Sequence, residues 1–301
     1  MKHKQLFANG ILLLTALIWG TAFAAQRVGM DYIGPFTFIA GRFFLSSLML
    51  VPLALLSDRM QKKETAADAA DKKKQRNWLL LGGLCCGTCL FFGSTFQQVG
   101  LVFTTASKSA FITALYIVLV PLCSIFLRHR PSIQCWIGVI LGAVGLYLLC
   151  ITGSFQIAKG DFIVLIGAFF WTGHVLSIDF FLSKGVNAVK LSLLQFCYCT
   201  VLGLIAAFLR ETPNFHAILT CAIPLLYAGC LSGGLGFTLQ AIGQKYTNPT
   251  VASLLMSMES VFGALAGIVL LHEVLSAKEL FGCIFLFAAI LISQIPKRKT
   301  E

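Results

Sequence analysis

The chain has 301 residues, of which 57% are hydrophobic and 12% are charged, and its mean hydropathy is +0.85. Soluble domains contain about 25% charged residues, so this composition excludes a soluble protein. The formal net charge is +11. Because the basic residues follow the loops between apolar segments, we interpret this charge as a signal of membrane topology and expect no nucleic-acid partner.

Apolar segments follow one another along the whole chain. About 20 residues at 1.5 Å per residue cross the ~30 Å hydrocarbon layer. The segments are apolar on all faces, whereas the strands of a membrane barrel alternate apolar and polar residues. We therefore predict an all-α integral membrane protein with ten transmembrane helices, near residues 7–26, 35–56, 78–99, 106–127, 133–152, 161–182, 190–209, 217–240, 250–271 and 278–295.

The distribution of Lys and Arg predicts the orientation of the chain. With the N-terminus inside, most of the 23 basic residues fall in inside segments, as cytoplasmic loops require. The first apolar segment follows a basic start, as in a signal peptide, but we expect it to stay as a helix because nine more follow. We predict a multi-pass protein of the cell inner (plasma) membrane, with both termini cytoplasmic. The basic run at 72–76 should meet anionic headgroups of membrane lipids.

An internal repeat divides the chain. QQVGLVFT at 97–104 aligns with QAIGQKYT at 240–247, an offset of 240 − 97 = 143 residues. We therefore predict two five-helix repeats, residues 1–152 and 153–301, that together form one transport domain. Because five is odd, the second repeat enters the membrane from the opposite side. Such inverted repeats are typical of alternating-access transporters, whose site lies near the midplane between the halves.

Three motifs then resemble a known family. The first apolar segment contains WGTAF at 19–23, both repeats share Gln-x-x-Gly-x-x-x-Thr, and MESVFGA at 258–264 precedes His272 and Glu273. Together with two five-helix halves, this pattern resembles the EamA family of the drug/metabolite transporter superfamily over nearly the whole chain.

The sequence departs from that family in two places. Ser260 replaces the usual proline, and RHR at 128–130 stands where an acidic end is expected. The resemblance implies a ten-helix carrier, commonly an exporter of amino acids or other small metabolites. It does not name the substrate, which varies within the family.

Glu259 is an acid close to the middle of a predicted span. A charge there costs about 2.5 to 3.5 kcal/mol on insertion scales, so we expect it to face the bundle interior or a wet cavity. It is a candidate for substrate binding and for proton coupling; the alternative is an acid that only fixes helix packing. At the repeat offset its counterpart is Tyr116, so we expect the phenol and the carboxyl to face one another.

An imidazole and two indoles form a second group of substrate-binding candidates. His174 lies in the sixth span, and because imidazole exchanges protons near neutral pH it is also a proton-coupling candidate. The alternative is that the neutral imidazole of His174 only donates a hydrogen bond between helices. Trp171 lies one turn earlier on the same face, and Trp19 has a similar place in the first half. Paired in this way, the indoles can clamp a ring or an apolar side chain, although aromatic residues most often serve packing.

Two amides and one cation complete the candidates. Gln97 and Gln240 are related by the repeat, and we expect them either to line the pathway or to bond neighbouring helices. Arg42 lies in the second span, where the default is that it snorkels to the surface. Its functional alternatives are an external gate or a ligand for a substrate carboxylate.

Cys86 and Cys89 have the spacing of a redox or zinc pair, but no second pair or nearby His completes a site, so we expect no metal. The start of an HExxH pattern at 272–276 has Ser in place of the second His, which makes a membrane enzyme acting on lipid a remote alternative. We expect no catalytic residue and no cofactor.

The favoured hypothesis is a secondary active transporter that exports a small amphiphilic metabolite, an amino acid or similar, by alternating access. The mixture of deep acidic and basic residues favours a zwitterion. The chain has no Walker motif, so a gradient must supply the energy, with proton coupling through Glu259 as one route. A uniporter or exchanger of another metabolite or drug-like compound, and a passive channel, remain alternatives. One chain supplies both halves, so a monomer suffices, although a dimer is compatible.

Overall fold

The computed structural model of this protein describes residues 2–61, 69–104, 106–126, 131–151, 158–263, 265, 276–293 and 295. Helices and their connections make up this described part, which contains no strand. The motif residues 128–130 and 272–273 lie outside it. In the first half the helices are α1 (Lys2–Gly29), α2 (Pro35–Gln61), α3 (Ala69–Leu101), α4 (Ala106–Ala114), α5 (Tyr116–Phe126) and α6 (Ile133–Cys150). In the second half they are α7 (Lys159–Ser183), α8 (Ala188–Arg210), α9 (Phe215–Thr220), α10 (Ala222–Leu226), the π-helix η1 (Tyr227–Phe237), α11 (Thr238–Gln244), α12 (Pro249–Met256) and α14 (Ala277–Ser293).

Seven helical segments of the described part are long and apolar enough to cross a membrane. They correspond to the first four predicted spans and to the sixth, seventh and eighth. The fifth and tenth correspond to α6 and α14, helices of 18 and 17 residues. The ninth, predicted at 250–271, lies partly outside the described residues. The class is therefore a helical multi-pass membrane protein, and the count of ten stays a prediction.

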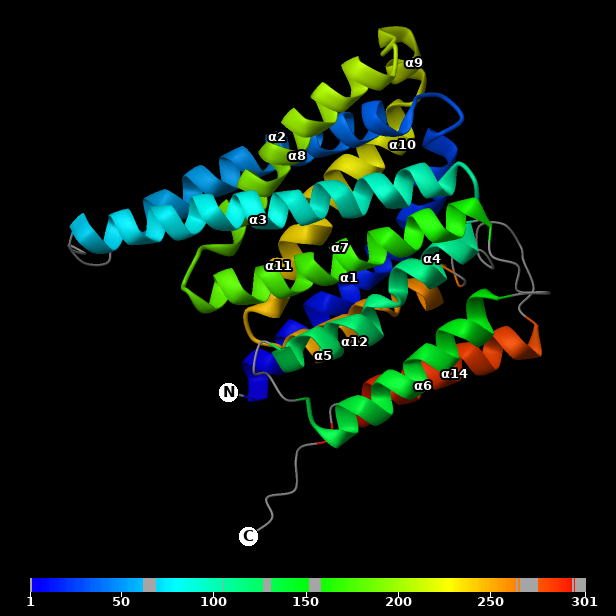
Figure 1. The fold of residues 1–301 in the computed structure, drawn as a ribbon. Coiled ribbons are helices and arrows are strands. Elements are labelled where there is room, and N and C mark those ends of the chain that lie inside the picture. The colour runs from blue at the N-terminus through cyan, green and yellow to red at the C-terminus, as the bar shows by residue number, and fades with distance from the viewer. Residues whose placement is uncertain are drawn as a thin grey trace.

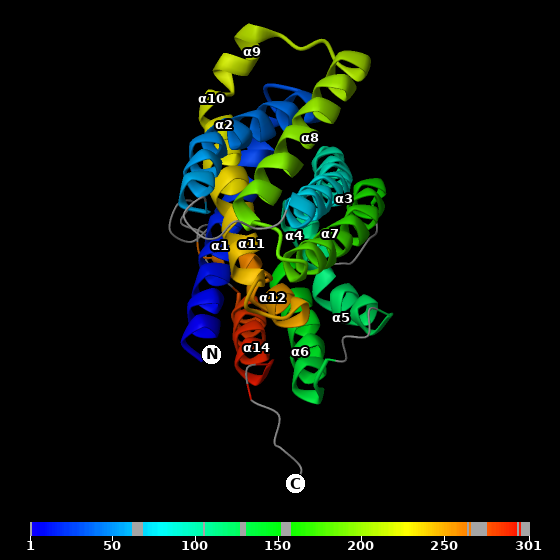
Figure 2. The same cartoon turned by 90° about the vertical axis from the view of Figure 1, so that its left-hand side faces the viewer.

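The helices run side by side in a bundle (Figure 1). α2 packs against α8 along one edge, and α6 packs against α14 at the opposite edge. Between these pairs lie α1, α7, η1, α11 and α12, while the short α9 lies at one end of the bundle (Figure 2). The start of α1 and the end of α14 lie at the same end in both views.

Local sequence sets several helix ends. The side-chain oxygens of Asn187 and Asn248 accept hydrogen bonds from the backbone N–H groups that begin α8 and α12. Asn is among the preferred N-cap residues because it satisfies these otherwise unpaired donors. Gly185, between α7 and α8, has a φ of +81°, a conformation that side chains with a Cβ rarely adopt. Asn187 and Gly185 together explain the tight turn by which α8 follows α7 in the chain.

Two predicted spans are broken helices. The span predicted at 106–127 is interrupted at Leu115, between α4 and α5, where the N–H bonds to the Ile112 carbonyl three residues earlier. The α-helix ends in the same way after α12, where the N–H of Met258 bonds to the Leu255 carbonyl. Leu115 and Met258 are related by the repeat offset, since 258 − 143 = 115. Neither break falls at Gly or Pro, so local sequence did not signal it.

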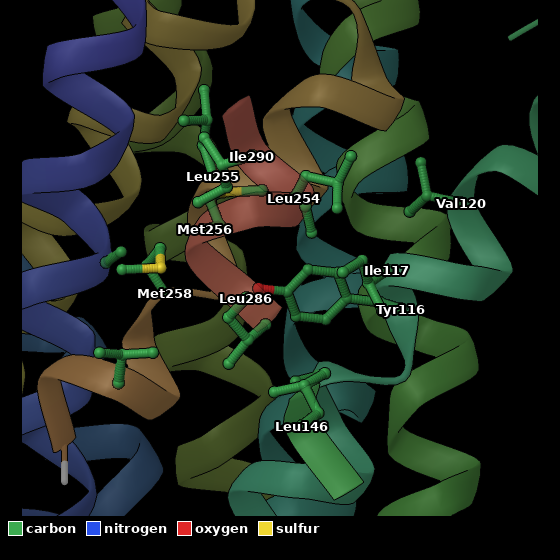
Figure 3. Close-up of a cluster of buried hydrophobic side chains, with 14 of the residues drawn as sticks. Tyr116, Ile117, Val120, Leu146, Leu254, Leu255, Met256, Met258, Leu286 and Ile290 are labelled. Carbon is green, nitrogen blue, oxygen red and sulfur yellow. The ribbon is translucent and has the colours of Figure 1, made fainter. Parts of the chain in front are cut away.

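The largest apolar cluster packs α5, α6, α12 and α14 against one another. In Figure 3 the Tyr116 ring lies between Leu254 and Leu146, surrounded by buried aliphatic side chains. The Tyr116 side chain is 4% exposed, so its ring belongs to this core while its hydroxyl reaches beyond it. The core therefore holds the two broken helices in place beside the centre of the bundle.

Candidate functional site

A central cavity opens between the helices at the level of the broken segments. Its wall combines charged, amide, hydroxyl and aromatic side chains from α1, α2, α3, α4, α5, α7 and η1 and from the segment after α12. The lining residues are Trp19, Phe23, Gln26, Arg42, Gln97, Thr113, Tyr116, Trp171, Ser232, Phe237 and Glu259. Six of the eight side chains that the sequence singled out therefore share one cavity.

Tyr116 and Glu259 begin the helical segments that follow the two breaks. The Tyr116 hydroxyl donates a hydrogen bond to Oε1 of Glu259 over 3.3 Å, and both residues are 4% exposed. The predicted contact between these repeat-related side chains is confirmed. Both side chains also line the central cavity. The side chain of Glu259 has this one hydrogen bond and no ion-pair partner among the described residues.

Arg42 lies on α2 and is also 4% exposed. Its Nη1 donates to Oε1 of Gln26 over 2.9 Å, and its guanidinium lies 4.9 Å from the centre of the Phe43 ring. The default expectation of snorkelling is wrong: the neighbouring amide and ring hold the cation inside the bundle. Nε of Arg42 has no hydrogen-bond partner, and no carboxylate of the described part pairs with this cation.

Aromatic side chains close one side of the cavity. The Trp19 indole N–H donates to the backbone carbonyl of Ser232 over 3.0 Å, which fixes this ring against η1. The rings of Trp19 and Trp171 lie 4.8 Å and 5.8 Å from that of Phe237, and the Trp171 and Phe237 planes are only 7° apart. Both indoles thus pack against an aromatic ring. In this conformation the ring is the side chain of Phe237 and not part of a ligand.

The amides and the imidazole take different places. Gln97 lines the cavity, whereas Gln240 is buried elsewhere with its Oε1 unpartnered. His174 is fully buried behind the wall, and its Nε2 lies 2.9 Å from Oε1 of Gln195 on α8. It contacts Trp171 and Phe237 instead of the cavity itself.

The sequence reasoning missed five lining residues. Gln26 had a signal, since an amide in an apolar helix needs a partner, and it holds both Arg42 and, through its backbone carbonyl, the Gln98 amide. Ser232 and Thr113 are small hydroxyl residues of a kind that is common in membrane helices. Phe23 and Phe237 are two of 26 phenylalanines, and nothing in their local sequence marks them.

The cavity is small in this conformation. It leaves about 40 Å³ for the centres of water-sized molecules, which suits a few waters but not a metabolite. Any larger ligand therefore needs the wall to move. No group of three or more His, Cys, Asp or Glu side chains comes together as a metal site in the part of the chain that the structure describes.

Comparisons with known proteins point in one direction. The sequence matches the EamA-like transporter family over residues 6–151 and again over 158–294. A protein of Archaeoglobus fulgidus, named an uncharacterized transporter, is 30% identical over 295 residues, covering 96% of this chain and 86% of the relative. The uncharacterized transporter YoaV of Bacillus subtilis is 23% identical, covering 94% and 95% of the two chains. A crystal structure with 19% identity has the same fold, with a TM-score of 0.76 over 95% of this chain and 96% of the other.

Proposed function

Because the chain belongs to the EamA-like transporter family, and is therefore a membrane transporter and not an enzyme, we propose that it exports a zwitterionic metabolite such as an amino acid. The cargo crosses the cell inner membrane by alternating access. The observation that carries this proposal is that one basic and one acidic side chain, Arg42 and Glu259, line one buried cavity without an ion-pair partner among the described residues.

Unpaired charges at this depth are costly, and proteins retain them where a ligand or an ion completes the site. A zwitterion supplies the two missing partners at once. Its carboxylate can accept hydrogen bonds from the Arg42 guanidinium, which is suited to that geometry. Its ammonium group can donate to Glu259. A cation alone or an anion alone would leave one of the two protein charges unpaired, so the pair selects for both groups in the same molecule.

The arrangement of the helices supports alternating access. α1 packs on η1, α11 and α12, while its counterpart in the repeat, α7, packs on α3, α4 and α5. α2 packs on α8 and α6 packs on α14, so that each of these two pairs joins an element with its own counterpart. The breaks at Leu115 and Met258 are also related by the repeat. Discontinuous helices at the interface of inverted repeats are where such carriers bind their cargo.

Proton coupling is assigned to Glu259, with His174 as the second candidate. When cargo leaves, Glu259 loses its cationic partner and retains only the hydrogen bond from Tyr116. Uptake of a proton then removes the uncompensated charge while the binding site reorients. Arg42 is a basic group on the cavity wall, and its positive charge disfavours the presence of a proton and a cationic cargo in the cavity at once.

The test is the thermal stability of the purified protein with a panel of amino acids, at about pH 6 and about pH 8, because a ligand that binds the folded state raises apparent stability. We expect a stabilising amino acid whose effect depends on pH and is lost in Glu259→Gln but kept in Glu279→Gln, an acid outside the cavity. A ligand equally effective in Glu259→Gln would refute the role of the acid. A ligand without pH dependence would point to a uniporter or exchanger.

A further inference from the structure

Phe237 separates the central cavity from a second buried polar region. Its ring lines the cavity, is 2% exposed, and lies 5.7 Å from the imidazole of His174 on the other side. It also meets the rings of Phe43 on α2 and Phe196 on α8, at 6.3 Å and 6.1 Å. Together with Trp19 and Trp171, this side chain completes an aromatic layer formed by α1, α2, α7, α8 and η1.

The region behind the layer contains polar side chains from α7, α8 and α11, each at most 2% exposed. They are His174, Ser192, Gln195, Gln240 and Gln244. Each has a side-chain atom that lacks a hydrogen-bond partner within the described part of the chain: Nδ1 of the imidazole, the Ser192 hydroxyl, Nε2 of Gln195 and the amide oxygens of Gln240 and Gln244. Most buried polar groups in proteins have a hydrogen-bond partner, so these five atoms offer bonding positions to a ligand that reaches them.

The helix that carries Phe237 has an unusual backbone geometry. η1 has the wide turns of a π-helix over 11 residues, a rare geometry that is frequent at functional sites. Its backbone is bonded to neighbouring side chains: Ser46 donates to the Gly229 carbonyl over 2.7 Å and Trp19 to that of Ser232. A Cβ on Gly236 would lie 2.6 Å from Nε1 of Trp19, so glycine allows this close approach. A local change of turn geometry would rotate Phe237 relative to both contacts.

We propose that Phe237 is a gate between the central cavity and the cluster at His174, and that this cluster is a second, transient site for the same polar cargo. The inference rests on the proposed transport function. The cluster presents an imidazole, a hydroxyl and three amides, which offer both donors and acceptors. Such groups can bond either end of a zwitterion without the strong retention of a charged pair. Cargo thus leaves the charged cavity for a weaker site once the aromatic layer opens.

The experiment measures access to the cavity and needs no known cargo. Thr113→Cys places a thiol on the cavity wall, and Ser192→Cys places one in the cluster. A small membrane-impermeant methanethiosulfonate cation is added to either face of sealed vesicles, and labelling is read at each cysteine by peptide mass spectrometry. The eleven native cysteines serve as internal references. The reagent is added to the face of the membrane from which Ser192→Cys is labelled. We expect Thr113→Cys then to react about tenfold or more faster in the Phe237→Ala background than with Phe237 in place.

The matched control is Phe38→Ala, which removes an equally buried ring from a cluster away from the cavity. Labelling of Thr113→Cys should stay at its original rate in that background. An equal rate in the two alanine variants, or faster labelling only from the opposite face, would overturn the gate. If Phe237→Ala does not give a single folded species, Phe237→Leu carries the same test with a smaller change in volume. Failure of the transport proposal would appear separately, as absent amino-acid binding in a protein whose labelling still depends on Phe237.

Discussion

The helix pair α6–α14 and the central cavity are both built from apolar helices, but they are packed in opposite ways. In the pair, a Cβ on Gly145 would lie 2.8 Å from the Gly282 carbonyl oxygen, and a Cβ on Gly282 would lie 2.6 Å from the Leu149 backbone nitrogen. Backbones thus meet directly and leave no space. At the cavity, Arg42 and Glu259 are ionisable side chains without an ion-pair partner among the described residues. Close packing stabilises the helix pair. In the cavity, ionisable side chains without ion-pair partners make it possible to bind a ligand.

The largest effect should follow from removing the cation of the cavity. Arg42→Met keeps much of the side-chain volume but cannot bind a carboxylate. Hydrogen bonds to charged groups contribute about 1.5 to 3 kcal/mol, so cargo binding should weaken about ten- to hundredfold. Binding is measured by titrating purified protein with the stabilising amino acid. Arg210→Met, at the exposed end of α8, is the control and should bind normally. Unchanged affinity in Arg42→Met would return this residue to a packing role.

The next effect concerns stability in the helix pair. Gly282→Ala forces the α6 and α14 backbones apart, and overpacking of this kind typically costs about 1 to 3 kcal/mol. Gly10→Ala is the matched control, because a Cβ there meets nothing within 4 Å. Apparent thermal stability in lipid or detergent should fall for the first variant only. Equal stability of the two would show that the helices do not depend on this contact.

A smaller effect should follow from loosening the aromatic wall. Trp19→Phe keeps a ring but removes the indole N–H that binds the Ser232 carbonyl, a bond worth about 0.5 to 1.5 kcal/mol. We expect slightly lower thermal stability together with altered transport, since the ring borders the cavity. Trp136→Phe, on α6 and not part of the cavity wall, controls for the loss of an indole. If transport changes equally in both variants, the effect is not local to the wall.

The smallest effect is expected at the bond between the repeat-related side chains. Tyr116→Phe removes a hydrogen bond of 3.3 Å, which is long, so transport should fall about two- to fivefold. Its pH dependence should shift as well, because the hydroxyl contacts the carboxyl that we assign to proton coupling. Tyr147→Phe, on the exposed face of α6, should leave both unchanged. A pH profile that is identical in wild type and Tyr116→Phe would argue against that assignment.

Much of the site could be predicted because ionisable and repeat-related residues stand out in an apolar chain. The offset of 143 residues placed Tyr116 opposite Glu259 before any geometry was known, and the contact is present. The cost of burying charge pointed to Glu259 and Arg42, although it did not show that Arg42 stays inside. A chain position alone cannot distinguish a snorkelling cation from one that a neighbouring amide retains.

The rest of the site depends on tertiary contacts that leave no local signal. Phe237 matters because α1, α7 and η1 converge on it, and the same residue type lines lipid-facing surfaces elsewhere in the chain. The breaks at Leu115 and at Ser257–Met258 have no glycine or proline. The sequence did not predict the π-helical turns of η1 either, because glycines like those of η1 are also common in regular membrane helices.

The most direct measurement compares an amino acid that binds with its two truncated analogues, the amine without the carboxylate and the acid without the amino group. Wild type should bind each analogue about tenfold or more weakly than the parent. In Glu259→Gln the acid should bind no worse than the parent, and in Arg42→Met the amine should bind no worse than the parent. This crossed pattern would assign one end of the cargo to each charge. If wild type binds both analogues as tightly as the parent, the two charges do not form a zwitterion site.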